Sequence, residues 1–226
     1  MQLLDYLSHE IEATFREHPR QFFTEYDIHT QLALIAIRLL EKNGHLHAQT
    51  SDKYIVSRVH HEYPTPFRCL MKGSEFKQIT EKEFNEEKRK NPRFRARRGF
   101  LDFAIINSEC VSSNRLSVVS GKRYRDLQES ARHRQNIALD LAVEVVYYPT
   151  LDERPHAGTM NRQVSSTLQD YQKLVALMEF ETNNVSYCKE AAMMFFSNTR
   201  HKDLLSEKLG SLPRHAKVAL YSVFAE

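Results

Sequence analysis

A near-continuous apolar run at residues 137–148, IALDLAVEVVYY, places the strongest constraint on the fold. The run is rich in β-branched and aromatic residues and is followed by Pro149, which is typical of a buried strand that ends there. Glu144 lies in its middle, and a buried carboxylate is costly unless a positive group meets it. The run therefore predicts a strand whose central acid needs a partner, either structural or chemical.

The remaining periodicities predict a mixed order of helices and strands, which favours a layered α/β domain. Thr24 resembles a helix N-cap and Gly44 a helix stop, whereas Pro64 and Pro66 are expected to end the first strand. We see no internal repeat. Helices are expected at 1–20, 24–44, 166–180 and 201–210, and strands at 52–64, 98–106, 137–148, 190–198 and 216–224.

The composition, 41% hydrophobic and 27% charged, is that of an ordinary globular chain. No apolar run approaches the roughly 20 residues that span a bilayer, so no membrane is expected. The first residues carry acids and no basic region, unlike a signal peptide. The three cysteines are far apart and suggest free thiols, which favours a cytoplasmic location. No glycine-rich fingerprint indicates a small-molecule cofactor.

The net charge is only +3, but two segments are strongly basic. Residues 86–98 hold seven Lys and Arg against two Glu, and residues 121–134 hold five against two acids. Such segments favour a phosphate backbone, although a solvated surface explains each of them equally well. The candidates for backbone contacts are Arg93, Arg95, Arg97, Arg98, Lys122 and Arg123.

Three acids interrupt strands that are otherwise apolar. Glu62 ends the strand expected at 52–64, and Asp102 interrupts the strand expected at 98–106. In the strand expected at 137–148, Glu144 shares a face with Ala142 and Val146. Two carboxylates about 4 Å apart repel by roughly 4 kcal/mol at an effective dielectric of about 20. If the three converge, a divalent cation with oxygen ligands would sit between them. The alternative is that each acid simply pairs with a Lys or Arg.

Four segments together resemble the PD-(D/E)XK nuclease superfamily, in which a helical acid or a strand-end Glu precedes a Gly-x-x-Asp strand, a strand ending Glu-x-Lys, and a helix that often begins Asp-x-x-Lys-Leu. The segments are HEYPTPFR (61–68), RRGFLDFAII (97–106), LAVEVVYYP (141–149) and DYQKL (170–174).

The resemblance implies a restriction-endonuclease-like three-layer α/β core, with a central mixed sheet flanked by helices. A single domain would then span residues 1–226, with an N-terminal helical extension at 1–45. It also implies DNA hydrolysis that depends on Mg²⁺ or Mn²⁺. Glu62, Asp102 and Glu144 would be the metal-associated carboxylates, and the carbonyl of Val145 a further ligand.

The chain departs from this pattern at Val146, which occupies the place of the strand lysine. In the family that lysine positions the attacking water and stabilises developing charge, and valine can do neither. Lys173 on the following helix is the candidate replacement. The alternatives are an inactive relative that binds nucleic acid or a partner protein, and an unrelated α/β domain whose acids only form salt bridges. A homodimer is compatible with each of them.

Overall fold

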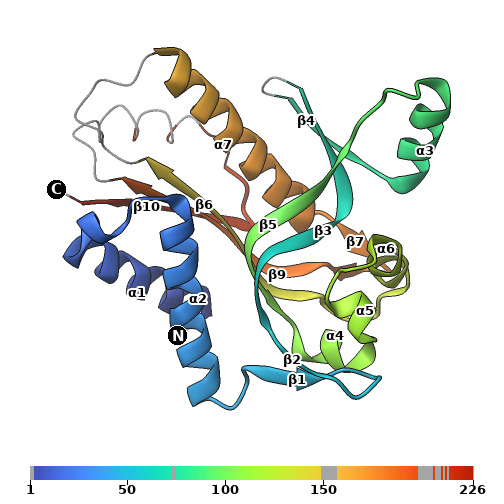
Figure 1. Ribbon diagram of the computed structural model, residues 1–226, viewed down its shortest axis with the longest axis horizontal. Helices are drawn as coiled ribbons and strands as arrows, with labels where there is room; N and C mark the ends of the chain where they lie inside the picture. The colour runs from blue at the N-terminus through green and yellow to red at the C-terminus, as the bar shows by residue number, and fades with distance from the viewer. Residues whose placement is uncertain are drawn as a thin grey trace.

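The computed structural model describes residues 3–72, 75–148 and 157–197, together with 206, 210, 212 and 214–225. At its centre lies a six-stranded mixed sheet (Figure 1). β10, β9 and β6 run parallel to one another, and the pairings from β6 through β5 and β3 to β4 are antiparallel. From edge to edge the strands are β10 (Val218–Phe224), β9 (Cys188–Ser197), β6 (Leu139–Tyr148), β5 (Arg97–Ile106), β3 (Val59–Lys72) and β4 (Glu75–Ile79).

Helices cover both faces of this sheet, so the protein is a mixed α/β structure in three layers (Figure 1). The long helices α1 (Leu3–Glu17) and α2 (Glu25–Lys42) pack on one face, and α7 (Ala157–Met178) packs on the other. The smaller elements are η1 (Pro19–Gln21), α3 (Glu81–Lys90), α4 (Ser108–Ser113), α5 (Leu116–Val119), α6 (Tyr124–His133), and the hairpins β1 (His47–Gln49) with β2 (Ile55–Ser57) and β7 (Glu181–Thr182) with β8 (Val185–Ser186).

The alternation of β6 divides the core in two. Val143 and Val145 belong to the cluster with α1 and α2, whereas Ala142 and Val146 belong to the cluster with α7. The expected strand at 137–148 is therefore confirmed, and Glu144 lies on its α7 face. The segment 1–45, predicted as an extension, supplies one of the two helical layers. No helix in the described part of the chain is long and apolar enough to cross a bilayer.

The first predicted strand does not end at its prolines. β3 continues through Pro64 and Pro66 to Lys72, and its register against β5 shifts between Pro64 and Arg68. Such an irregularity accommodates residues that cannot donate a ladder hydrogen bond. The strand β4 and the helices α3 to α6 were not predicted. Most of the helix expected at 201–210 lies outside the described residues.

Candidate functional site

The candidate site lies where β5 and β6 separate. Their pairing stops at Phe103 opposite Val143, and beyond this point Figure 1 shows the two strands diverging. At this point a side chain replaces the backbone pairing: Asp102 Oδ2 accepts a hydrogen bond of 2.8 Å from the backbone N–H of Val145. Asp102 thus joins the two strands with its side chain at the point where their backbones part.

The simple alternation expected for the Asp102 strand fails at this point. Phe103 packs with α1 and α2 as alternation requires, but Leu101, two residues away, packs in the opposite cluster with Ala104. On the neighbouring strand β3, Glu62 has a φ of +48°, in the left-handed region. The local change in strand direction lets the Asp102 side chain reach between the strands towards α2, rather than standing on the face of Ala104.

The partner of Glu144 is Lys173. The Lys173 Nζ lies 2.8 Å from Glu144 Oε2 and donates to the carbonyl of Phe100 at 2.7 Å. A third contact of 3.3 Å joins it to Asp170 Oδ1, one turn earlier in α7. Glu144 is only 1% exposed and Lys173 is 5% exposed, so this ion pair is shielded from solvent. Lys173 therefore points from α7 over the sheet to Glu144.

The charges around this pair decide its protonation. Burial lowers the pKa of Lys173, but the carboxylates of Glu144, Asp170 and Asp102 outweigh burial, so that the pKa lies above its ordinary value. Lys173 is therefore a fixed cation and a hydrogen-bond donor, not a base. Burial raises the pKa of Glu144 well above its ordinary value, while the attraction of Lys173 opposes that rise.

The start of α2 adds two groups that the sequence analysis did not include in the site. Glu25, His29 and Asp102 each offer a ligand atom, and the three atoms lie within 4.8 Å of one another. A capping box fixes the start of this helix: Asp27 Oδ2 accepts from the Thr24 N–H at 2.8 Å, and the Thr24 hydroxyl accepts from the Asp27 N–H at 3.3 Å. Glu25 and His29 are one turn apart, so they face the same way.

These donors fit a divalent cation. His29 Nε2 is buried and has no hydrogen-bond partner among the described residues, and it lies 3.8 Å from Asp102 Oδ2. Glu144 Oε1 is a second buried atom without such a partner in the described chain. The carboxylates of Glu25, Asp102, Glu144 and Asp170 interact with one another and face the single ammonium of Lys173. A metal ion held by Glu25, His29 and Asp102 would give the imidazole a partner and offset the negative charge of the carboxylates around it.

The ligand set differs from the oxygen-only set that was expected. An imidazole nitrogen suits later transition metals, whereas carboxylates suit Mg²⁺ and Mn²⁺. The mixed set of His29 with Glu25 and Asp102 therefore favours Mn²⁺ over Mg²⁺. Partial desolvation of the carboxyl, followed by the negative charge of Asp102, raises the pKa of Glu25 to about 7, although much of the residue is exposed. Burial also lowers the pKa of His29, which favours the neutral imidazole that metals bind.

Glu62 and Glu144, both predicted as metal ligands, lie outside the donor group of Glu25, His29 and Asp102, and Glu144 pairs with Lys173. Glu62 is solvent-exposed on β3, and the donor group found among the described residues contains Glu25 in its place. The negative charge of Glu62 still raises the pKa of His29 in opposition to burial, so Glu62 lies at the rim of the site. Val145 contacts the site through its N–H, and the role predicted for its carbonyl stays a prediction.

The acid nearest Glu144 on the same strand face shows what an ordinary structural carboxylate looks like here. Asp140 forms a salt bridge with Arg58 and accepts a hydrogen bond of 2.8 Å from Asn107 Nδ2. Each of its oxygens therefore has a partner, whereas Glu144 leaves one oxygen without one among the described groups. This contrast separates a satisfied carboxylate from a site carboxylate on one strand.

The predicted backbone contacts divide into exposed and half-buried residues. Arg98 is half-buried: its guanidinium donates to the carbonyl of Gly121 and lies 4.7 Å from the centre of the Tyr124 ring. Arg95 Nη1 donates to the carbonyls of Pro92 and Phe94, both at 3.1 Å, although the residue remains exposed. Exposed positions are also occupied by Arg93, Arg97, Lys122 and Arg123.

Signals for the missed residues were present in the sequence. Glu25 directly follows a recognisable N-cap, and the pattern of the resembled family allows a helical acid in place of a strand-end Glu. His29 lies on the buried side of α2 with Ile28 and Leu32, where a polar residue needs a reason.

Comparison with protein-family models, with curated proteins and with solved structures finds no match to this chain.

Proposed function

We propose that the protein is a metal-dependent nuclease that hydrolyses phosphodiester bonds of DNA. The observation that carries the proposal is the contact of Lys173 with Glu144, beside Asp102, where β5 and β6 separate. It supplies from α7 the cation that Val146 cannot supply from the strand. A purely structural salt bridge would not require two further acids and an unpaired imidazole beside it.

Glu25, His29 and Asp102 would hold the divalent cation. When bound, the metal would neutralise charge on the phosphate and lower the pKa of a bound water. The buried Glu144 would remain next to Lys173 and keep its ammonium in one orientation. Lys173 would act on the reacting phosphate through its positive charge, because its three N–H groups already contact Glu144, Asp170 and the carbonyl of Phe100.

The reaction adds water across one ester bond. The water oxygen bonds to phosphorus, the bond from phosphorus to one ester oxygen breaks, and the proton of the water ends on the released hydroxyl. The positive charge of Lys173 opposes the negative charge that develops during this exchange. The exposed basic residues, among them Arg93, Arg97 and Arg123, would contact neighbouring phosphates and make binding depend on salt.

A cleavage assay tests the proposal. Plasmid and single-stranded DNA are incubated with the protein and Mg²⁺, Mn²⁺ or chelator, and wild type is compared with Asp102→Asn and Glu25→Gln. We expect cleavage by wild type with metal, faster with Mn²⁺ than with Mg²⁺, and a loss of about 100-fold or more in each variant. The control is Glu12→Gln, which removes only an exposed pair with Arg16 and should cleave normally.

The metal itself gives a second readout. Titration with Mn²⁺, followed by electron paramagnetic resonance, should show one tight site in wild type. His29→Ala should weaken it by about tenfold or more, since one of three protein ligands is lost. Equal cleavage by wild type and both carboxylate variants would refute the nuclease proposal. DNA binding without cleavage, in protein that has bound Mn²⁺, would instead support the inactive binding relative.

A further inference from the structure

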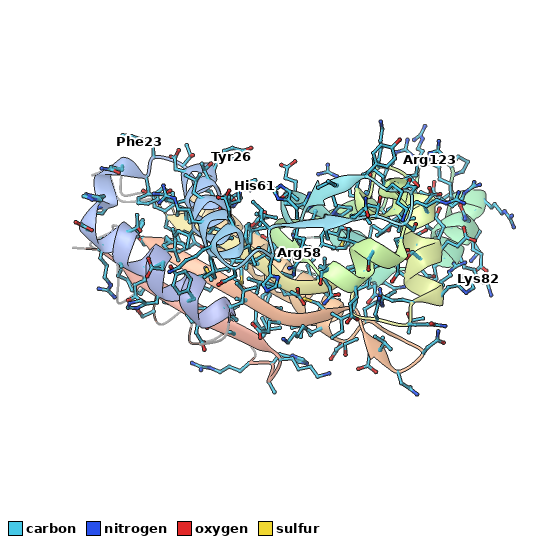
Figure 2. All side chains as sticks on the ribbon, turned by 90° about the horizontal axis from the view of Figure 1, so that it is seen from below. Phe23, Tyr26, Arg58, His61, Lys82 and Arg123 are labelled. Atoms are coloured by element: carbon cyan, nitrogen blue, oxygen red, sulfur yellow. The ribbon has the colours of Figure 1, made fainter. Side chains whose placement is uncertain are left out.

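Exposed aromatic side chains flank the acidic site. Phe23 is 77% exposed and Tyr26 is 61% exposed, and they lie on either side of Glu25 in the sequence. Figure 2 shows both at the start of α2, along the same side of the molecule as His61. Single exposed apolar residues are common on protein surfaces, but two large aromatic side chains exposed to water beside a candidate metal ligand are unusual.

Tyr26 belongs to a cluster of three rings that reaches the acidic site. Tyr26 and His61 are stacked with ring centroids 6.1 Å apart, and His61 is stacked on His29 at 6.3 Å. His29 in turn lies 3.8 Å from the Asp102 carboxylate. The Tyr26 and His29 ring centroids are also 5.9 Å apart, so the three rings form a compact triangle beside the candidate metal ligands, with Tyr26 as its most exposed member.

The backbone beneath these rings is fixed. Asp27 Oδ2 accepts hydrogen bonds of 2.8 Å from the N–H groups of both Phe23 and Thr24. An exposed ring on a fixed backbone loses little conformational freedom when a flat ligand stacks on it. The backbone that carries Phe23 and Tyr26 is therefore held in place by the capping of α2.

We infer that Phe23, Tyr26 and His61 form a stacking platform for unpaired bases, and that the substrate of the neighbouring site is single-stranded nucleic acid. This inference rests on the proposed function and names its substrate class. A base inside a duplex presents only its edge, whereas an unpaired base presents a whole face to an aromatic ring. Figure 2 places Arg123 on the upper edge as well, but at the far end of the molecule from Phe23 and Tyr26.

The test measures binding separately from cleavage. A fluorescein-labelled oligothymidine of 20 nucleotides and a 20-base-pair duplex are titrated with the full-length protein in chelator, with fluorescence anisotropy as the readout. We expect wild type to bind the single strand more tightly than the duplex. Tyr26→Ala should weaken single-strand binding by about 5- to 100-fold, as loss of one stacked base does elsewhere. Its salt dependence should not change, because no charge is removed.

Two variants control the result. Tyr26→Phe keeps the ring and should restore binding. Tyr54→Ala removes a ring of similar exposure, 55%, between β1 and β2, at the opposite end of α2 in Figure 1, and should bind as wild type does. Unchanged single-strand binding by Tyr26→Ala, equal losses on the duplex, or no binding by wild type would each overturn the inference.

Failure of the platform and failure of the nuclease proposal are distinguishable. If Tyr26→Ala loses single-strand binding while wild type with Mn²⁺ cleaves nothing, the platform stands and hydrolysis does not. If wild type cleaves but Tyr26→Ala binds and cleaves the single strand normally, hydrolysis stands and the platform is refuted. Thermal unfolding of Tyr26→Ala should match wild type, because an exposed ring contributes little to stability.

Discussion

Replacing Lys173 by Met isolates the energetic role of the buried ion pair. The ammonium has 2.8 Å and 2.7 Å contacts with Glu144 and with the carbonyl of Phe100. Glu144 is 1% exposed and already has one unpartnered oxygen in the described structure, so it has no route to water when the lysine is lost. Leaving such a charge uncompensated costs about 3–5 kcal/mol. The loss of Lys173 destabilises Asp170 much less, because 27% of the Asp170 side chain is exposed to water.

The expected loss is large compared with the total stability of a domain, about 5–15 kcal/mol. The double variant Lys173→Met/Glu144→Leu keeps the reasoning testable even if the single variant unfolds. It replaces both charges with apolar groups, which is often neutral or stabilising relative to a buried pair. We expect it to recover to within about 1 kcal/mol of wild type, measured as the free energy of unfolding in urea by circular dichroism.

The pH dependence of the single variant follows from the same charges. Burial already raises the pKa of Glu144, and without Lys173 nothing nearby opposes that rise except the charges of other acids, which add to it. The folded state of Lys173→Met then binds a proton at pH values where the unfolded chain, with an ordinary pKa of 4.5, does not. The deficit against wild type should therefore shrink as the pH falls from 8 towards 4.5. A deficit below about 1 kcal/mol at pH 7, or an equal deficit in the double variant, would refute the reasoning.

Two further changes test how the site is positioned. Asp27→Ala removes the capping box of α2 and should cost about 1 kcal/mol in thermal unfolding at pH 7. Hydrogen bonds from Thr24 and Phe23 lower the pKa of Asp27 in the folded state. The stability difference between wild type and Asp27→Ala should therefore be complete above pH 3.8, the ordinary pKa, and should vanish as the pH falls through the lower pKa of the folded state. A stability difference that persists at pH 2 would contradict this. Gly99→Ala would place a Cβ 2.5 Å from the Thr65 hydroxyl and should cost about 1–3 kcal/mol in urea, while Gly210→Ala, with no atom within 4 Å, serves as the control and should unfold as wild type does; equal stability of the two would contradict the crowding.

Local patterns were enough to place several parts of the site. The N-cap at Thr24 and the apolar run around Glu144 were recognisable because capping and strand alternation depend on neighbours a few residues away. The position of Lys173 one turn after Asp170 indicated a side chain that could point over the sheet. The structure places it there, 2.8 Å from Glu144.

Other features depend on contacts between distant segments, and local patterns misjudged them. Glu62, with a φ of +48°, stands outside the donor group, and β3 extends past prolines that locally suggest an end. Arg98 was expected at the surface but is tied to Gly121, 23 residues away. Strand irregularities of this kind arise from pairing with other strands, which the period of one segment does not encode.

The buried carboxylate at Glu144 and the need for a cation to meet it follow from the chain alone, because burying an unpaired charge is costly in any fold. Which groups meet around it follows from how the sheet and helices pack. Glu25 and His29 come from α2 and Lys173 from α7, more than 100 residues apart in the chain, and they converge only because β5 and β6 separate between them. Convergence of this kind is a property of three-dimensional packing, and no periodicity within one segment specifies it.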